Sequence, residues 1–257
     1  MTHLRVEKAA GNNAIWCDTI CRAHGIPGEF RDEVWFNRHP VPRFYPNVVT
    51  LHAQDGGAAQ LASIQAVAAT GLPSGWGVKD SFCSLDLNAL GFQPLFEANW
   101  LWREPFQPLP SRAASDLRWA WIKDAPELTR WETAWSSSQT SDTLTRRPRL
   151  FLPTMLANPE IGFVAAYRGQ TIVAGAIANH TKDVVGLSNV FVPQDDTVVF
   201  WAGCVFMTHE RFSNMPIVGY ESGRDLAIVQ EIGFERLQPL RVWISQVGAT
   251  THFTLHL

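Results

Sequence analysis

The segment that decides the fold is Ile217-Val218-Gly219-Tyr220-Glu221, followed by Ser222-Gly223-Arg224-Asp225, residues 226–232, Gly233-Phe234 and residues 237–243. This pattern predicts a strand, a polar step, a helix, a tight turn and a second strand. Gly233 ends the helix, because glycine adopts the left-handed cap conformation without a Cβ clash. Phe234 then docks the turn back onto the core.

The same order of residues occurs earlier in the chain, between residues 74 and 102. Its Gly91-Phe92 pair lies 142 residues before Gly233-Phe234. At this spacing further residues align without a gap: Gly77 with Gly219, Leu90 with Ile232, Leu95 with Leu237, and residues 47–50 with residues 189–192. Such a constant spacing predicts a two-copy internal repeat. The alternative is that two α/β segments share their turn chemistry by chance.

The length and composition are typical of a globular protein. Its 257 residues suit two small domains or one large one, and 46% are hydrophobic and 18% charged. The formal charge of −3 gives no strongly basic surface, so we expect no nucleic-acid partner. No apolar run reaches the length of a membrane span, and the N-terminus lacks the apolar core of a signal peptide. The sequence therefore predicts a cytoplasmic protein with no membrane partner.

The four cysteines do not form a disulfide framework in a chain of this length. Cys17 and Cys21 lie one helical turn apart, with His24 close behind. A metal site would need a fourth ligand, which is not evident, and the spacing is not that of a zinc knuckle. We therefore expect a reduced, half-buried pair and no metal.

Seven of the eleven tryptophans lie between Trp76 and Trp135. We interpret these rings as the filling of a seam between two domains. The alternative is an aromatic-lined pocket at the domain interface.

The remaining pattern gives the order of elements. In the first half we expect a strand at 4–8, a helix at 14–24, strands at 34–36 and 47–51, and helices at 58–69 and 85–90. In the second half we expect a strand at 117–123, a helix at 125–137 capped by Asp124, a hairpin at 161–179, a strand at 184–193, a helix at 197–211 and a last strand at 250–257.

This order, together with the Gly-Phe pair after the last helix, resembles the GNAT acetyltransferase superfamily over nearly all of residues 117–257. The first copy is 29 residues shorter and looks like a trimmed version. We therefore expect an α+β fold with a mixed sheet and two GNAT-like domains: residues 1–103, a proline-rich linker at 104–116, and residues 117–257.

The resemblance implies acetyl-CoA beside the fourth strand, which is Val190-Phe191-Val192 in the second copy, with its pyrophosphate on the amides that open the next helix. The family motif there is Gln or Arg, two residues, Gly, one residue, and Gly or Ala. The first copy fits this spacing with Gln54, Gly56, Gly57, Ala58 and Ala59, although Asp55 adds an unfavourable charge. In the second copy Asp196, Val199 and Trp201 fall at the motif positions, and Asp195 or Asp196 is explained more simply as a helix cap.

The resemblance also implies a tyrosine acid four residues before the glycine of Gly-Phe, where this chain has Leu87 and Val229. The nearest substitutes are Glu221 as base and Tyr220 as acid. The alternative is that Glu221 pairs with Arg224 while Tyr220 packs.

The predicted function is therefore an acyl-CoA-dependent N-acyltransferase that uses acetyl-CoA and acts on a small-molecule amine. The alternative is a non-catalytic GNAT-like binding module that has lost CoA binding. Asp196 and the two missing tyrosines favour this second reading.

Overall fold

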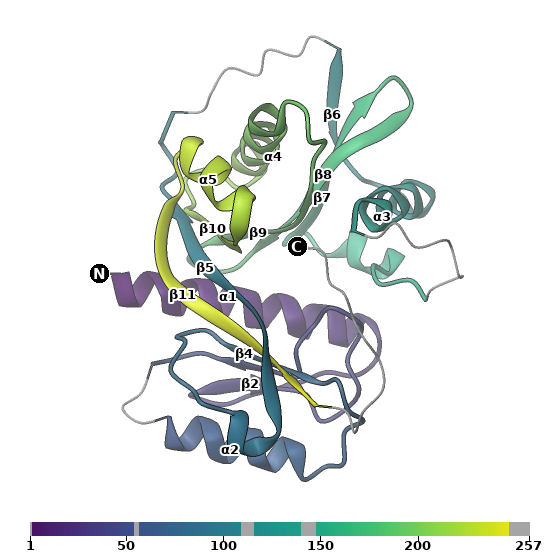
Figure 1. Ribbon diagram of the computed structural model, residues 1–257. Helices are drawn as coiled ribbons and strands as arrows, with labels where there is room; N and C mark the ends of the chain where they lie inside the picture. The colour runs from purple at the N-terminus through teal and green to yellow at the C-terminus, as the bar shows by residue number, and fades with distance from the viewer. Residues whose placement is uncertain (1, 54–56, 109–115, 140–147, 247–257) are drawn as a thin grey trace. The chain divides into compact units, whose positions relative to one another are not determined.

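The computed structural model describes residues 2–53, 57–108, 116–139 and 148–246 (Figure 1). These residues form two compact units: unit 1 contains residues 2–100 and 237–246, and unit 2 contains residues 101–236. Each unit combines helices with strands, so the predicted α+β class is confirmed. Within these described ranges no helix is long and apolar enough to cross a membrane.

Residues 237–246 belong to unit 1, so β11, which begins at Glu235, contains residues of both units. The predicted domain limits of 1–103, 104–116 and 117–257 stay a prediction.

Unit 1 is built from α1 (Thr2–Ala23), β1 (Glu29–Phe30), β2 (Val34–Phe36), β3 (Val48–Thr50), α2 (Ala58–Ala68), β4 (Gly77–Asp80), the 3-10 turn η1 (Asn88–Leu90), most of β5 (Phe92–Arg103) and most of β11 (Glu235–Ser245). Its strands follow the order β1-β2-β3-β4-β11-β5. The pair β3–β4 is parallel, whereas β1–β2, β2–β3 and β4–β11 are antiparallel pairs. A strand from the C-terminal part of the chain, β11, thus lies between β4 and β5.

The first element corrects a prediction, because α1 is one continuous helix where a strand at 4–8 and a helix at 14–24 were expected. Its buried positions include Val6, Ala9, Ala10, Cys17 and Cys21, and this spacing is that of a helix face. The short alternation at 4–8 was outweighed by the longer helical stripe. A second correction concerns residues 85–90, of which only Asn88–Leu90 are helical.

The two cysteines on α1 lie fully in this buried stripe. Burial raises the pKa of the Cys17 thiol to about 11 and that of Cys21 to about 12. Both cysteines are free, and no group of three or more potential metal ligands exists in the described part of the chain.

Two helices cover opposite faces of the unit 1 sheet. Val34, Phe36 and Val78 pack with Ile64 and other residues of α2 in one cluster. Trp35 and Val49, which point the other way because side chains alternate along a strand, pack with Ala14, Cys17 and Cys21 of α1. Strand alternation thus fixes which helix each face binds.

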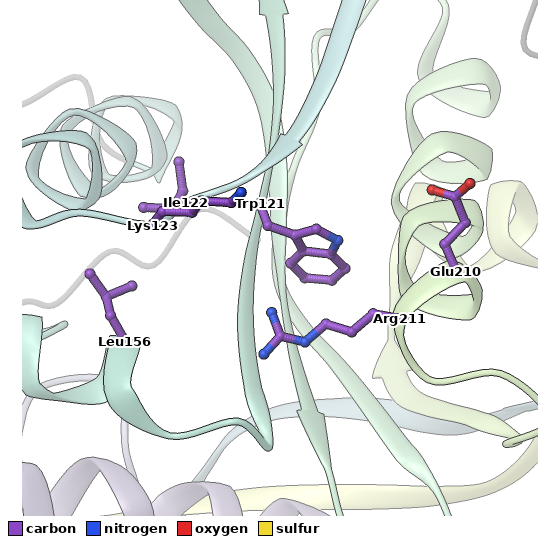
Figure 2. A pocket seen from close by; sticks show the side chains of 6 residues that line it. All are labelled: Trp121, Ile122, Lys123, Leu156, Glu210 and Arg211. Carbon is purple, nitrogen blue, oxygen red and sulfur yellow. The ribbon is translucent and has the colours of Figure 1, made fainter.

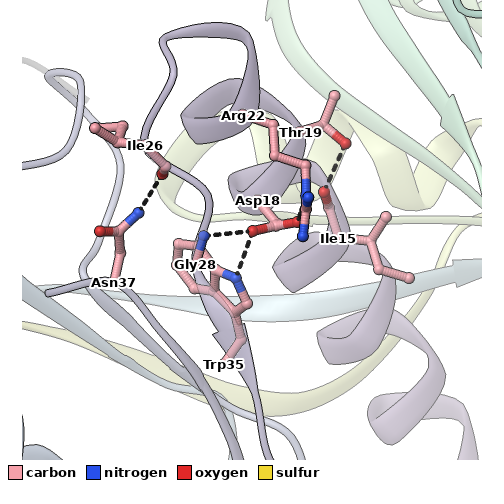
Figure 3. A network of polar contacts seen from close by, with 8 residues as sticks. All are labelled: Ile15, Asp18, Thr19, Arg22, Ile26, Gly28, Trp35 and Asn37. Atoms are coloured by element: carbon pink, nitrogen blue, oxygen red, sulfur yellow. Dashed lines mark hydrogen bonds and ion pairs between the residues drawn. The ribbon is translucent and has the colours of Figure 1, made fainter. Parts of the chain in front are cut away.

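A buried carboxylate anchors α1 to the segment before β2 (Figure 3). Asp18 is only 6% exposed, and its Oδ1 accepts the Gly28 N–H at 2.8 Å and the Trp35 Nε1–H at 3.1 Å. Its Oδ2 pairs with Arg22, whose side chain is exposed. Gly28 is needed here because a Cβ at this position would lie 2.5 Å from Nε1 of the Trp35 ring.

Unit 2 is built from β6 (Leu117–Trp121), α3 (Ala125–Gln139), the 3-10 turn η2 (Pro153–Ala157), β7 (Ile161–Arg168), β8 (Thr171–His180), β9 (Val185–Phe191), α4 (Thr197–Arg211), β10 (Ile217–Glu221) and α5 (Gly223–Glu231). Its strands follow the order β10-β9-β8-β7-β6. The hairpin, the strand at 184–193, the helix at 197–211 and the strand at 217–221 were predicted and are confirmed. Asp124 caps α3 as expected, since its Oδ1 accepts the Glu127 N–H at 2.8 Å. The predicted last strand at 250–257 lies outside the described residues.

Helices α3 and α4 cover opposite faces of the unit 2 sheet. Ala174 and Ala176 of β8 face residues of α4, including Phe200 and Trp201. Gly175 between them faces α3, where a Cβ would lie 2.5 Å from Nε1 of Trp131. The Trp131 ring itself lies 5.3–5.5 Å from three phenylalanine rings, those of Phe151, Phe163 and Phe191.

The two halves of the sequence share one pairing scheme. In unit 1 the strands β1–β2 and β2–β3 pair antiparallel and β3–β4 parallel, and in unit 2 β7–β8, β8–β9 and β9–β10 do the same. Gly91 and Gly233 both have the predicted left-handed conformation, with φ of 79° and 93°. The hairpin strands have two and three residues in unit 1 against eight and ten in unit 2, so the N-terminal copy is the trimmed one. The duplication of the chain stays an inference from these matches.

The seven tryptophans between residues 76 and 135 all have contacts inside their own unit. Trp76 packs edge-on against Phe92, and Trp100 Nε1 donates to the Ser81 carbonyl at 2.8 Å in unit 1. In unit 2 the ring of Trp119 packs against Phe200. The interpretation of these rings as a seam between domains stays a prediction.

A buried arginine links the segment after β5 to the C-terminal end of α5. Arg103 is fully buried, and its guanidinium donates to the carbonyls of Glu104, Ile232, Gln107 and Pro108. Its Nη1 also lies 2.9 Å from His209 Nε2. Burial, and then the Arg103 charge, lower the pKa of His209 to about 4, so this imidazole is a neutral acceptor.

We expect Asp18→Ala to lower the stability of unit 1 by about 2–4 kcal/mol, because two buried N–H donors lose their acceptor. Urea unfolding followed by circular dichroism measures this. Arg22→Ala is the matched control, and we expect it to cost less than about 1 kcal/mol because that partner is exposed. Equal losses in both variants would contradict the assignment of the stability to the two N–H bonds.

We expect His209 to make stability rise with pH between about 4 and 6.5. The unfolded chain takes up a proton on this side chain near its ordinary pKa of 6.5, whereas the folded chain resists protonation down to about 4. The contribution is therefore complete above pH 6.5 and is lost as the pH falls toward 4, by roughly 2 kcal/mol. Urea midpoints across this range measure it. His209→Gln, which keeps an acceptor but does not titrate, should flatten the profile, and an unchanged slope would disprove the effect.

Candidate functional site

The parallel strands β9 and β10 separate early in unit 2. Their register contains only two pairs, Ile217 with Val185 and Val218 with Gly186, although β9 continues to Phe191 and β10 to Glu221. An irregularity in the β8–β9 pairing and a left-handed Asn189, with φ of 51°, accompany the separation. The result is a wedge between two parallel strands, at the end of the sheet where ligands bind in α/β folds.

The wedge is filled by side chains of unit 2. Trp201, from the second turn of α4, is 4% exposed and packs in a core cluster with Leu101, Leu187 and Phe234. These residues and Gly219–Glu221 enclose a cavity of only about 10 Å³. Trp201 Nε1 is buried there and finds no hydrogen-bond partner among the described residues. Such a space is at the lower limit for one water molecule and is far too small for the arm of a coenzyme.

Glu221 stands at the open end of β10 and is partly buried. Burial raises the pKa of its carboxyl to about 8, and the nearby charge of Asp225 raises it further, while the Ser222 N–H lowers it. No ion pair joins Glu221 to Arg224 among the described residues. Burial raises the pKa of Asp225, and the charge of Arg224 partly offsets this effect. Glu221 is therefore a carboxyl group that changes its charge just above neutral pH. Tyr220 precedes it and lines the same cavity.

Coenzyme binding was predicted for Val190 and Phe191 at the end of β9 and for Val192 directly after it, and their side chains pack inside unit 2. Phe191 is 5% exposed and its ring lies 5.3 Å from that of Trp131. The side chains of Val190 and Val192 pack against the α4 cluster. What these residues could offer a ligand is their backbone, since β9 has no partner on the β10 side beyond Gly186.

The loop before α4 corrects the predicted alignment of the two copies. The N-caps of α2 and α4 are Gly57 and Asp196, which lie 139 residues apart and not 142. Val199 and Trp201 are therefore inside the helix and not in a phosphate loop. Asp196 holds the left-handed conformation, with φ of 60°, that Gly57 holds in unit 1, but its side chain makes no capping hydrogen bond. Together with Asp195 it places two carboxylates where an anion would have to approach.

The matching loop in unit 1 has a different character. Gln54 and Gly56, predicted to bind the coenzyme, lie outside the described residues. Gly57 has φ of 58°, and its missing Cβ leaves room for Leu85, which would otherwise be 2.8 Å away. Ala58 and Ala59 follow as exposed residues, and the first turn of α2 has no side-chain cap and no acidic residue. The amides that open α2 are thus left without a side-chain cap among the described residues.

Two buried polar atoms near this helix also have no partner within the described residues. They are Oε1 of Gln60, in the first turn of α2, and Oγ of Ser81, just after β4. Both side chains are at most 1% exposed. Because both atoms are closed off from solvent, they do not form part of a surface site.

The strand ends of unit 1 are otherwise closed. Thr50 Oγ1 accepts the Ser81 N–H at 2.8 Å and so bridges the ends of β3 and β4. Asp80 is fully buried and caps the turn that follows, with the Leu85 N–H 2.9 Å from its Oδ2. Lys79, which aligns with Glu221 in the predicted repeat, donates to Asn13 of α1 at 2.9 Å. Unit 1 thus has no counterpart of the Glu221 carboxyl at this position.

The structure therefore separates the predicted site residues. Tyr220 and Glu221 lie together in unit 2, while Gly57, Ala58 and Ala59 lie in unit 1. Trp201 as the filling of the wedge and Arg103 as a buried tether were not predicted. A tryptophan at a core-facing position of α4 is the sequence signal that could have suggested the filled wedge.

We expect the Glu221 carboxyl to titrate near pH 8, which a ¹³C titration of the glutamate side chains would show as a signal absent from Glu221→Gln. Because the folded state holds this proton to higher pH than the unfolded state, stability is fully present below about pH 4.5 and falls as the pH rises toward 8. Glu221→Gln should therefore raise the urea midpoint at pH 9 more than at pH 5. Asp225→Asn should lower the titration midpoint, and a midpoint near 4.5 in the unmodified protein would refute the buried-carboxyl assignment.

Comparison with known proteins identifies the fold. A GCN5-related N-acetyltransferase from Kribbella flavida superposes with a TM-score of 0.59 at 13% identity, covering 96% of both chains. One from Sphaerobacter thermophilus gives 0.53 at 12% identity, covering 79% of this chain and 73% of that one. A tandem GNAT protein from the clavulanic acid biosynthesis pathway gives 0.50 at 11% identity, covering 95% and 96%. No family model and no curated protein matches the sequence. On this evidence the chain has the α+β fold of the GNAT acetyltransferases.

Proposed function

We propose that this chain is an acyl-CoA-dependent N-acyltransferase that acts on a small amine, with acetyl-CoA held by unit 1. The observation that supports this best is the N-terminus of α2, where a left-handed Gly57 and two exposed alanines leave the first amides uncapped. This arrangement follows a strand in a fold whose solved examples are named acetyltransferases. When bound, acetyl-CoA supplies a thioester whose acyl group passes to the amine.

The fit to the coenzyme differs between the units. In unit 1 the N–H groups of Ala58 and Ala59 would hold phosphate oxygens. In unit 2 the residues do not fit, because Trp201 fills the wedge and Asp195 and Asp196 stand at the opening of α4. No coenzyme role is assigned to unit 2.

We assign proton transfer to Glu221, with Tyr220 as the acid. An amine is an ammonium ion at neutral pH and must lose a proton before its lone pair can attack. With a pKa of about 8, the Glu221 carboxylate is a stronger base than an ordinary glutamate, and it becomes available to take that proton as the pH rises toward 8. Tyr220, at the same end of β10, would give a proton to the thiolate that leaves when the acyl group is transferred.

The alternative function is a non-catalytic binding module that retains the fold. The filled wedge of unit 2 is the observation that favours it, because the cavity beside Glu221 measures only about 10 Å³. Binding of acetyl-CoA to the whole chain, followed by transfer to any amine, would decide against this alternative.

We expect calorimetry to detect acetyl-CoA binding to the intact chain and Ala59→Glu to weaken it at least about tenfold, because a carboxylate beside the helix N-terminus repels phosphate. Ala66→Glu is the matched control, since it makes the same change on an exposed position of the same helix. We expect that control to alter the affinity less than about twofold.

The outcomes separate the parts of the proposal. An absence of heat at about millimolar acetyl-CoA would remove the acyltransferase. Equal losses in Ala59→Glu and Ala66→Glu would remove the α2 site. Thiol release from acetyl-CoA with spermidine, glucosamine and tyramine as acceptors tests turnover. Retention of full turnover in Glu221→Gln would remove its role as base while leaving the coenzyme site intact.

A further inference from the structure

A second cavity of unit 2 lies away from the wedge, at the C-terminal end of α4 (Figure 2). It has a volume of about 490 Å³, is open to solvent and is lined by Trp121, Ile122, Lys123, Leu156, Glu210 and Arg211. Figure 2 shows the Trp121 indole at its centre, with the Arg211 guanidinium directed toward the ring. None of these residues has a role in the acyltransferase proposal.

The guanidinium of Arg211 is held in place by the backbone. Its Nη2 donates to the Pro159 carbonyl at 2.9 Å and to the Ile161 carbonyl at 3.0 Å, and its Cζ lies 5.0 Å from the centre of the Trp121 ring. Gly162 makes the stack possible, because a Cβ there would lie 2.3 Å from the Trp121 ring and 3.2 Å from Arg211 Nη1. A charge that is positioned in advance loses little entropy when it binds a ligand.

The free donors of this arginine have no partner in the described chain. Its Nε and Nη1 make no hydrogen bond to a described residue, and no carboxylate forms an ion pair with it there. Burial lowers the pKa of Arg211, and the charge of Glu160 partly offsets this effect. Glu160 itself is paired with His180. Lys123 adds a second exposed cation, while the Glu210 carboxylate points away from the guanidinium in Figure 2.

The cavity is separate from the site of the proposed reaction. Residues Trp201 and Arg211 stand near opposite ends of α4, whose 15 residues span about 22 Å. Glu221 ends β10, whereas Arg211 precedes the start of that strand. A ligand at Arg211 therefore cannot be the substrate that meets Glu221.

We propose that this cavity binds a small carboxylate with an apolar body. The planar fork of Arg211 and the ammonium of Lys123 would hold the carboxylate. The apolar body would lie against the indole of Trp121 and the side chains of Ile122 and Leu156. A free phosphate could use the two cations but leaves the apolar wall exposed to water, so the carboxylate is the better fit.

Phenylacetate is the test ligand, with phenylacetamide as its neutral isostere and inorganic phosphate as the anion without an apolar body. We expect phenylacetate to bind the intact chain with a Kd of about 1 mM or better and both comparison ligands at least about tenfold more weakly. The indole N–H signal of Trp121, identified by its loss in Trp121→Phe, should shift during the titration and so locate the site.

Two variants test the cations and one serves as control. Lys123→Gln, at an exposed position, should weaken phenylacetate binding at least about fivefold, and Arg211→Lys, which loses the fork, at least about tenfold. Arg118→Lys is the control, because Arg118 also stacks on a ring of unit 2, that of Tyr167, and should change affinity less than about twofold.

Four results would overturn the proposal. They are no saturable shift of the Trp121 signal up to about 20 mM phenylacetate, equal binding of phenylacetamide, phosphate binding as tight as that of phenylacetate, and unchanged affinity in both cation variants. None of them bears on acetyl-CoA, which is titrated separately.

Discussion

Two parallel strands that part from each other expose backbone groups and leave a wedge that something must fill. In unit 2 the strands β9 and β10 part after two paired residues, and the filling is the indole of Trp201 together with Leu187 and Phe234. In unit 1 the strands β3 and β4 stay linked, because Thr50 Oγ1 accepts the Ser81 N–H. How each unit fills or bridges the space between its two parallel strands decides which polar groups remain at the strand ends.

The two solutions leave different groups free. In unit 2 Glu221 lies beside the filled wedge, and burial raises the pKa of its carboxyl. In unit 1 the carboxyl at the end of β4 is Asp80, whose pKa burial also raises, but its oxygens already accept backbone N–H groups of the next turn, while Lys79 donates to Asn13. The N-termini of α2 and α4 also differ. Gly57 leaves the first amides of α2 without a side-chain cap, whereas Asp195 and Asp196 place two carboxylates at the N-terminus of α4.

Two arginines of unit 2, the buried Arg103 and the exposed Arg211, are both held by backbone carbonyls. Arg103 is satisfied by carbonyl oxygens and a neutral His209, without a described carboxylate. Arg211 uses only Nη2 for the backbone and keeps its other donors directed at an open cavity. The guanidinium of Arg103 is surrounded by acceptors, whereas Nε and Nη1 of Arg211 have no acceptor among the described residues. Only Arg211 therefore suggests a ligand.

The sequence by itself determined the order of elements and the class of fold. The left-handed Gly91 and Gly233, the Asp124 cap and the helix at 197–211 follow from local backbone chemistry, which acts over a few residues and can be recognised in the chain. The helical stripe of α1 was mistaken for a strand at residues 4–8 because a short alternation fits both periods. Tertiary structure alone decided that residues 237–246 belong with the N-terminal unit, that Trp201 closes the wedge and that Arg211 stands over Trp121. These facts depend on contacts between residues far apart in the chain, which no local pattern encodes.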